Sequence, residues 1–330
     1  MNESSTIFDV IVLGSGPSGL TAALYTSRAL LNTLVIGGNP PGGQLTITSN
    51  IENFPGFPED ITGSELISRI RKQAEKFGSK FVDENAVKIS GSFEENFTIE
   101  TDCGNVFKSK SVIIATGASA KWMGIENEKR LVGKGVSACA TCDGFFFKDR
   151  VVAVVGGGDS AMEEATYLSR FASKIYVLVR RGVNDLRASK IMQKKAFENP
   201  KIEFLFKTTV KEILGENEVE GIKILKKVEK DGVEVDEEII MNDVKGLFLA
   251  IGHQPNTEFL SGFVETNELG HILTFGNSKT SKEGVFASGD VQDTRYKQAA
   301  SAAGFGCMAA IDTIKFLAER GIEVHVSTYE

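Results

Sequence analysis

Two short apolar runs, each followed at once by a glycine-rich turn, constrain the fold of this chain most strongly. Residues 8–19 read Phe-Asp-Val-Ile-Val-Leu-Gly-Ser-Gly-Pro-Ser-Gly, and residues 150–161 read Arg-Val-Val-Ala-Val-Val-Gly-Gly-Gly-Asp-Ser-Ala. A segment of helical pattern follows each turn, and a further apolar run ends each unit, at residues 33–36 and 174–179. Strand, glycine turn, helix and strand in this order predict two βαβ units.

The glycines of such a turn allow the backbone to approach a pyrophosphate, and the helix that follows points its amides at the negative charge. A plain tight turn is the alternative, but a strand before and a helix after each turn favour dinucleotide binding. Strand-plus-glycine signals at residues 111–117 and 246–252 mark two points where the chain passes between units. We therefore expect an α/β protein with two Rossmann-like, three-layer domains, one discontinuous (1–118 and 252–330) and one inserted into it (119–251).

Composition excludes some classes of protein. The 330 residues carry a net charge of −7 with basic and acidic residues interspersed, which argues against a nucleic-acid-binding surface. No apolar stretch reaches the roughly 20 residues that a membrane span needs, and the first residues lack the features of a secretion signal. A cytoplasmic protein is expected.

Basic residues after the second unit indicate which ligand it binds. Where an NAD site places an acid for the ribose hydroxyls, this chain has Arg180 and Arg181, with Arg187 further along. Guanidinium groups suit a 2′-phosphate, so NADPH is expected there. A solvated basic turn is the alternative.

The first unit also lacks an acid, because Ile36 is followed by Gly-Gly-Asn. Residues 41–44 offer backbone amides instead, and Asn53 offers a polar side chain. Asp290 follows a later strand, where it can hydrogen-bond a ribityl hydroxyl, and the helix beginning near residues 298–299 directs its positive end towards the same region. These features suit a two-part cofactor such as FAD, although the small residues of that helix also suit close packing on a sheet.

Cys139 and Cys142 form a Cys-x-x-Cys pair between the two glycine turns. Such a pair is a redox dithiol, half of a zinc site or two inert thiols. Zinc requires two more ligands, and only the isolated Cys103 and Cys307 remain, so no metal is expected. Two nucleotide sites favour the redox function, and Asp143 is the candidate acid because no histidine is near it in sequence. Capping of a helix is the alternative role for Asp143.

Together these motifs resemble the low-molecular-weight thioredoxin reductases of bacterial type, over almost the whole chain. The motifs that carry the resemblance are residues 14–19, 42–45, 52–56, 138–144, 156–161, 250–253, 287–290 and 298–299. The resemblance implies an FAD domain interrupted by an NADPH domain, in a cytosolic homodimer that reduces thioredoxin. It places Cys142 beside the flavin, makes Cys139 the exchange thiol and makes Asp143 the acid.

The motifs and the resemblance together predict three sets of binding residues. The FAD set is Gly14, Ser15, Gly16, Pro17, Ser18, Gly42, Gly43, Gln44, Leu45, Asn53, Val87, Gly289, Asp290, Gln298 and Ala299. The NADPH set is Gly156, Gly158, Asp159, Ser160, Arg180, Arg181, Arg187, Ile251 and Gly252. The thioredoxin set is Lys134, Phe145 and Phe146, although the run 145–147 is also readable as plain core.

Three features depart from the family pattern. Five residues separate Arg181 from Arg187, where the family often has three. Lys297 stands where an arginine is usual, and the glycine-rich residues 37–43 contain no acid.

The expected reaction passes electrons from NADPH to FAD, to the cysteine pair and then to a protein disulfide. The resemblance implies rotation of the inserted domain about hinges near Gly117 and Gly252. Alternatives are a related flavin enzyme that uses ferredoxin or oxygen, and a redox-sensing flavoprotein.

Overall fold

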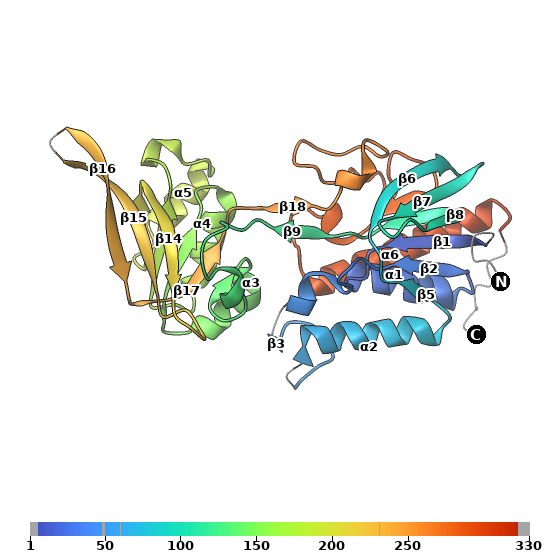
Figure 1. The fold of residues 1–330 in the computed structure, drawn as a ribbon, viewed down its shortest axis with the longest axis horizontal. Coiled ribbons are helices and arrows are strands. Elements are labelled where there is room, and N and C mark those ends of the chain that lie inside the picture. Colours follow the sequence, from blue (N-terminus) through green and yellow to red (C-terminus); the bar gives the residue numbers. More distant parts are fainter. Residues whose placement is uncertain (1–5, 48–49, 60, 231, 323–330) are drawn as a thin grey trace. The chain divides into compact units, whose positions relative to one another are not determined.

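The chain divides into two compact units in the computed structural model, which describes residues 6–47, 50–59, 61–230 and 232–322. Unit 1 consists of Met1–Ser119 and Gln254–Glu330, and unit 2 of Ala120–His253 (Figure 1). The first boundary between the units lies one residue further along the chain than expected, and the second boundary lies two residues further along. The two crossings are made by short strands that pair with each other, β9 (Ala118–Ala120) and β18 (His253–Pro255).

Unit 1 is built on a seven-stranded sheet with β1 (Ile7–Leu13) at its centre. This strand pairs in parallel with β2 (Thr33–Ile36) on one side and with β8 (Val106–Ile114) on the other. The sheet is completed by β5 (Lys80–Val82) beside β2, by β19 (Val285–Ala287) beside the end of β8, and by the antiparallel β6 (Ala86–Ser92) and β7 (Asn96–Thr101). The strands expected at residues 8–13 and 33–36 are therefore confirmed.

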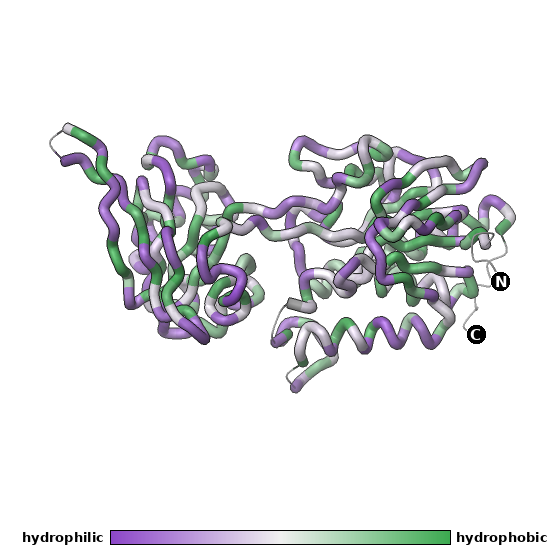
Figure 2. Tube along the Cα trace, in the orientation of Figure 1, coloured by the Kyte–Doolittle hydropathy of each residue, from purple (hydrophilic) through white to green (hydrophobic). Residues whose placement is uncertain are grey.

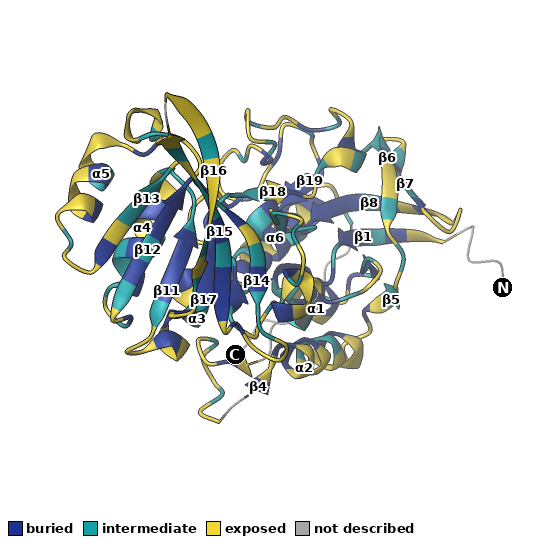
Figure 3. Ribbon diagram, turned by 60° about the vertical axis from the view of Figure 1, so that its left-hand side comes forward, coloured by how far each residue is buried: buried dark blue, intermediate teal, exposed yellow. Residues whose placement is uncertain are grey.

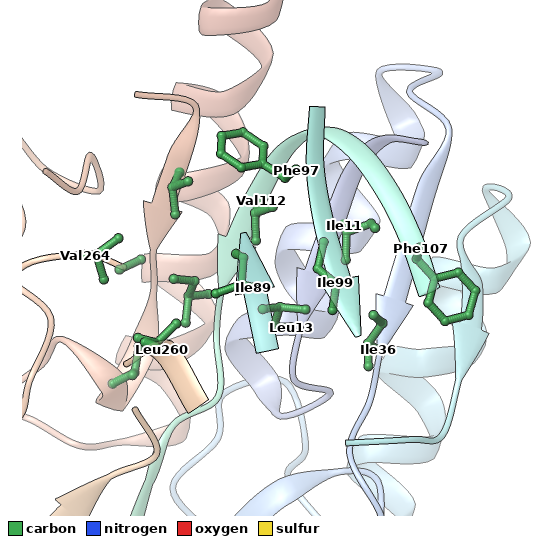
Figure 4. Close-up of a cluster of buried hydrophobic side chains, with 14 of the residues drawn as sticks. Ile11, Leu13, Ile36, Ile89, Phe97, Ile99, Phe107, Val112, Leu260 and Val264 are labelled. Atoms are coloured by element: carbon green, nitrogen blue, oxygen red, sulfur yellow. The ribbon is translucent and has the colours of Figure 1, made fainter. Parts of the chain in front are cut away.

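Each face of this sheet carries its own layer. Helices α1 (Pro17–Arg28) and α6 (Ala299–Glu319) pack against each other on one face, and α2 (Gly63–Lys76) packs on α1. On the other face lies an apolar core (Figure 4). It is formed by residues of the central strands together with residues of β6, of β7, which pairs only with the first part of β8, and of the segment after residue 258. Its fully buried members include Ile11, Leu13 and Phe97. The result is a three-layer domain.

Short elements complete unit 1. They are η2 (Gly43–Ile47), β3 (Asn50–Ile51), β4 (Ile61–Thr62), η6 (Glu258–Leu260) and η7 (Gly289–Val291). The α2 helix mixes hydrophilic and hydrophobic residues along its length (Figure 2), it contacts α1 and η2, and its buried residues include Leu66, Ile67 and Ala74.

Unit 2 has three layers of its own. Its centre is a parallel sheet in the order β10 (Val136–Ser137), β17 (Val244–Leu249), β11 (Val151–Val155), β12 (Lys174–Val179) and β13 (Ile202–Phe206). One face is covered by α3 (Ala140–Asp143), η4 (Gly144–Phe147), α4 (Asp159–Leu168) and α5 (Lys190–Phe197). The other face is covered by the antiparallel β14 (Thr208–Leu214), β15 (Gly221–Lys230) and β16 (Val233–Met241). The η3 turn (Lys129–Leu131) buries Leu131 in the core between the parallel sheet and these antiparallel strands, whereas the residues of the η5 turn (Val183–Asp185) are exposed.

The two sheets of unit 2 differ in the polarity and burial of their residues. The parallel strands β11 and β12 are apolar on both sides, and their middle residues are buried (Figure 3). Strand β16, at the edge of the antiparallel sheet, has no buried residue and carries acidic residues at 234 and 236–238. The predicted Rossmann-like fold class is confirmed in both units.

The expectation that no segment could span a membrane needs one refinement. Within the described ranges, one helix, α6, is long and apolar enough by composition to cross a bilayer. It packs on α1 and on the sheet through Ala309, Ala310 and Leu317, which are fully buried. This is the packing of a core helix.

Candidate active site

The cysteine pair lies at the start of α3, and its two sulfurs are joined in a disulfide. Cys139 precedes the helix in extended conformation, and its carbonyl accepts from the amides of Cys142 and Asp143 at 3.2 and 3.1 Å. Cys142 is exposed and Cys139 is half-buried. A tight helical turn therefore holds the two cysteines in position for reversible closure.

Asp143 is held close to this disulfide by Ser137, a buried residue that the sequence analysis did not single out. The Ser137 hydroxyl hydrogen-bonds the Asp143 carboxylate, and its oxygen accepts from the amide of Cys139 at 3.0 Å. Burial raises the pKa of Asp143, and the hydrogen bond from Ser137 opposes that rise in part. A carboxyl that retains its proton more readily is suited to donate that proton to a departing sulfur.

Thr141 lies between the two cysteines and contacts the first of them. Its hydroxyl oxygen is 3.3 Å from the Cys139 sulfur. A disulfide sulfur has no hydrogen, so the hydroxyl must be the donor. The same contact would stabilise a thiolate on Cys139 once the disulfide opens.

The three phenylalanines after the disulfide divide between surface and core. Phe147 is buried and lies edge-to-face on Phe248 with 5.1 Å between ring centroids. Phe145 and Phe146 are 60% and 40% exposed. Lys134 is also exposed, in the same unit. Phe147 is therefore part of the core, whereas the docking role of Phe145 and Phe146 stays a prediction.

The first glycine turn connects β1 to α1 by very close backbone approaches. A Cβ on Gly14 would lie 2.3 Å from the Ala115 carbonyl oxygen, and one on Gly19 would lie 2.0 Å from the Gly14 carbonyl oxygen. Gly16 precedes the helix without a side-chain cap, and Pro17 occupies its first turn. The amides of that turn point out of the helix end, as a pyrophosphate site requires.

The structure brings several distant residues of the predicted FAD set together. The Ser18 and Ser288 hydroxyls lie 2.5 Å apart, beside Gly289. The Asn53 amide donates to the Gln298 side-chain oxygen at 3.4 Å. Pairs separated by 270 and 245 residues in sequence thus meet at one end of unit 1.

Asp290 gives the clearest indication of a polar ligand in unit 1. Its Oδ1 atom is buried and has no hydrogen-bond partner among the residues that the structure describes. Burial, and then repulsion by Asp293, raises the pKa of Asp290 to about 6, although Lys297 opposes this. A buried acceptor without a partner suits a hydroxyl-rich chain such as the ribityl group of FAD.

The remaining residues of the FAD set lie in or near two loops. Gly42 and Gly43 have positive φ, and a Cβ on Gly43 would be 3.6 Å from the Gly16 Cα. Gln44 is exposed, Leu45 half-buried and Val87 47% exposed. The glycines therefore place the second loop directly over the first glycine turn.

The second glycine turn repeats this construction in unit 2. A Cβ on Gly156 would lie 2.5 Å from the Ala250 carbonyl oxygen, next to Ile251. Gly158 precedes α4 without a side-chain cap. The side chain of Asp159 is already engaged, because its Oδ1 accepts from the Ser189 amide at 2.7 Å. Gly252 (φ 101°) and the exposed Ser160 complete the predicted set near these strand ends.

The long loop after β12 folds back onto this turn. Residues 183–185 form the η5 turn, in which the Asp185 carboxylate accepts from the Gly182 amide at 3.1 Å. The Arg187 amide then donates to the Gly157 carbonyl at 2.9 Å. The loop is two residues longer than the family pattern, and the η5 turn folds it compactly. The backbone of Arg187 therefore lies beside the second glycine turn. Its side chain and those of the preceding arginine pair are exposed.

Comparison with known proteins agrees with this arrangement. The profile of the family "Pyridine nucleotide-disulphide oxidoreductase" matches residues 8–306. The chain belongs to this family. The family name pairs a pyridine nucleotide with a disulfide, and unit 2 carries both the second glycine turn and the Cys139–Cys142 disulfide.

Individual members of the pyridine nucleotide-disulphide oxidoreductase family match almost the whole chain. A thioredoxin reductase from Rickettsia felis is 46% identical over 312 residues, 93% of this chain and 97% of that protein. One from Dictyostelium discoideum is 49% identical over 325 residues, 96% of this chain and 99% of that protein. The solved thioredoxin reductase from Giardia duodenalis has a TM-score of 0.86 at 38% identity, covering 95% of this chain and 100% of that one. The resemblance inferred from the motifs is confirmed.

Proposed function

We propose that this chain is an NADPH-dependent flavoenzyme that reduces the disulfide of thioredoxin through its own Cys139–Cys142 disulfide. The observation that carries the proposal is this disulfide, closed beside a carboxyl whose pKa burial raises. Relatives named thioredoxin reductase, 46% and 49% identical over almost the full length, support the same substrate.

The residues of unit 1 fit FAD, and those of unit 2 fit NADPH. The first glycine turn and Asp290 would hold the pyrophosphate and the ribityl chain. The second glycine turn and the three arginines would hold the pyrophosphate and the 2′-phosphate of NADPH. FAD, when bound, supplies the chemistry that accepts a hydride from a reduced nicotinamide and makes its two electrons available to a disulfide.

The chain's own residues perform the thiol chemistry. Two electrons break the Cys139–Cys142 bond, and Asp143 donates a proton to one of the two sulfurs. The Cys139 thiolate, stabilised by Thr141, attacks the substrate disulfide, so that one substrate sulfur leaves and a mixed disulfide forms. The proton on Cys142 passes to the substrate sulfur that has left, and the Cys142 thiolate attacks the Cys139 sulfur, which releases the second substrate sulfur and restores the internal disulfide. One NADPH and one proton are consumed for each disulfide reduced.

The exposed pair Phe145 and Phe146 is proposed as the docking surface for thioredoxin, together with Lys134. Exposed aromatic rings immediately after a redox disulfide suit an apolar contact around the partner's own disulfide. A homodimer and a cytoplasmic location remain predictions from the resemblance.

Single cysteine variants test the exchange steps. Cys142→Ser should lose turnover and accumulate a mixed disulfide with thioredoxin through Cys139, because the resolving thiol is gone. Cys139→Ser should lose turnover without that adduct. Cys103→Ser is the control, since Cys103 is a free, exposed cysteine of unit 1. Undiminished turnover in either variant of the pair would contradict the scheme.

An anaerobic titration separates the proposal from its alternatives. NADPH should bleach the flavin, and added thioredoxin disulfide should restore its colour rapidly and repeatedly. Bleaching by reduced ferredoxin but not by NADPH would indicate a ferredoxin-driven enzyme. Peroxide production from a dithiol without NADPH would indicate an oxidase, and slow turnover with every disulfide would indicate a sensor.

A further inference from the structure

The end of strand β2 has no acid of its own, yet the structure places one there from another strand. In a dinucleotide-binding unit, an acid after the second strand normally binds the adenosine ribose hydroxyls. Gly37 occupies that position here, and a Cβ built on it would lie 3.2 Å from Asp83 Oδ1. A carboxylate oxygen of Asp83 therefore lies beside the place that the first side-chain carbon of an acid at position 37 would take, next to the Ser15 hydroxyl oxygen at 3.1 Å.

We propose that Asp83 supplies the carboxylate that binds the adenosine-ribose hydroxyls of FAD. This inference rests on the proposed function, because it assigns one contact within the expected flavin site. Asp83 belongs to none of the sets predicted from motifs, since it follows β5 rather than the second strand of the βαβ unit.

Strand pairing explains how Asp83 reaches this position. Strands β2 and β5 are parallel, with Ile36 opposite Val82, so their carboxyl ends meet at the same edge of the sheet. The Gly37 amide donates to the Val82 carbonyl at 2.8 Å and locks the two ends together. Asp83 then follows directly, with 43% of its side chain exposed and accessible to a ligand.

Arg71 holds the Asp83 carboxylate without using all of its acceptor capacity. The Arg71 Nη1 lies 2.9 and 3.2 Å from the two carboxylate oxygens, and its guanidinium lies 4.4 Å from the Phe81 ring centroid. A carboxylate has about four lone-pair sites, so it still has room for ribose hydroxyls. Arg71 also donates to Glu75 at 3.0 Å, which makes Glu75 a matched control.

Ser15 keeps the backbone of this edge in place. Its buried hydroxyl donates to the Gly37 carbonyl at 2.6 Å and accepts from the Gly42 amide at 2.7 Å. The only proton of the Ser15 hydroxyl is therefore already used in a hydrogen bond to the Gly37 carbonyl. Ser15 acts as a positioning residue that holds residues 37–42 against the first glycine turn, and Asp83 is left as the carboxylate at the ribose position.

Ligand binding by the flavin-free protein tests the assignment without depending on activity. The probes are FAD and an FAD analogue whose adenosine ribose lacks both hydroxyls, measured by fluorescence titration. The wild-type protein should bind the analogue roughly 10- to 100-fold more weakly than FAD, as expected for a hydrogen bond to a charged group. Asp83→Asn should weaken FAD by a similar factor and bind both probes alike. Glu75→Gln should behave as the wild type.

The results separate this inference from the proposed function. If the wild-type protein binds both probes equally but still reduces thioredoxin, only the assignment of Asp83 is overturned. Retention of the full preference for FAD in Asp83→Asn overturns it as well. A wild-type protein that binds FAD with the expected preference but reduces no disulfide supports the assignment and removes the proposed function instead.

Discussion

At the scale of the residue, Asp290, which is proposed to bind the flavin, also lowers the stability of the folded protein at neutral pH. Its pKa is raised to about 6, so the folded protein binds a proton that the unfolded chain, with an ordinary aspartate pKa near 4, has already released at pH 5. Where the folded state binds more protons, the free energy of unfolding falls as pH rises. The free energy of unfolding therefore carries its full contribution from protonated Asp290 below about pH 4, and this contribution is lost by about pH 7.

Asp290→Asn should remove this pH dependence. Flavin-free wild-type protein should lose up to about 3 kcal/mol of unfolding free energy relative to the variant between pH 4 and pH 7. The variant should also bind FAD about 10-fold more weakly, because the ribityl hydroxyls lose a charged acceptor. Urea unfolding at several pH values and flavin titration measure the two effects. If the free energies of unfolding of the wild type and the variant differ by the same amount at pH 4 and at pH 7, the raised pKa of Asp290 is contradicted.

Residue identity alone predicts some of these roles and misses others. Glycines of the two turns and the cysteine pair are recognised from sequence because their chemistry depends on residue type and local spacing. Ser137 and Asp83 are missed because their roles come from contacts that only folding creates. A serine two residues before Cys139 is a signal that was available, whereas Asp83 becomes informative only when β5 is known to lie beside β2.

At the scale of the element, the contact between α1 and α6 depends on one glycine. A Cβ on Gly306 would lie 2.2 Å from the Ser18 carbonyl oxygen, which belongs to the α1 backbone. Gly306→Ala should therefore destabilise the protein by about 2–3 kcal/mol, because the helices must move apart. Gly304 lies on the same helix with nothing within 4 Å, so Gly304→Ala should stabilise it by about 0.5–1 kcal/mol through helix propensity. Urea unfolding of both variants tests the pair, and effects of the same sign would contradict the close contact.

The loop between β12 and α5 carries Arg187, which is proposed to bind the 2′-phosphate of NADPH. The bond from the Arg187 amide to Gly157 keeps this arginine beside the glycine turn despite the longer loop. Arg187→Ala should raise the KM for NADPH about 10- to 100-fold and leave that for NADH unchanged, because only NADPH carries the 2′-phosphate. Arg170→Ala, which changes an exposed arginine just beyond the C-terminal end of α4, is the control. Equal effects on both cofactors would show that Arg187 does not contact the phosphate.

Element boundaries show where sequence periodicity is sufficient. Strands β2 and β12 lie at the predicted residues, and β1 and β11 differ by one residue at their starts. The charged residues 226–238 predict an exposed hairpin, and β15 and β16 pair there in antiparallel fashion. The other small antiparallel strands and the η5 turn were not predicted, because they depend on long-range pairing and on the capping contact of Asp185. The position of the Arg187 backbone beside the second glycine turn depends on the η5 turn, so sequence spacing alone does not predict it.

At the scale of the whole molecule, the redox disulfide and the expected flavin site belong to different units. The resemblance implies that unit 2 rotates about the chain crossings, so that the nicotinamide and the disulfide reach the flavin in turn. Gly117 lies next to the first crossing with φ 69°, and its carbonyl accepts from the Asn256 amide at 3.0 Å. A residue that visits positive φ easily gives this crossing access to conformations that other residues avoid.

Gly117→Ala should slow turnover several-fold, and Gly117→Val should slow it further, because a β-branched residue tolerates positive φ least. A Cβ at this position meets nothing within 4 Å, so any effect arises from the backbone rather than from a clash. Gly104→Ala is the matched control, since Gly104 also has positive φ (81°) and open space but lies in the turn between β7 and β8. Dithionite titration should still give four electrons for each protein in every variant, two for the flavin and two for the disulfide. Slower turnover with an unchanged electron count would assign the effect to movement between units, whereas equal turnover in all variants would remove Gly117 as a hinge.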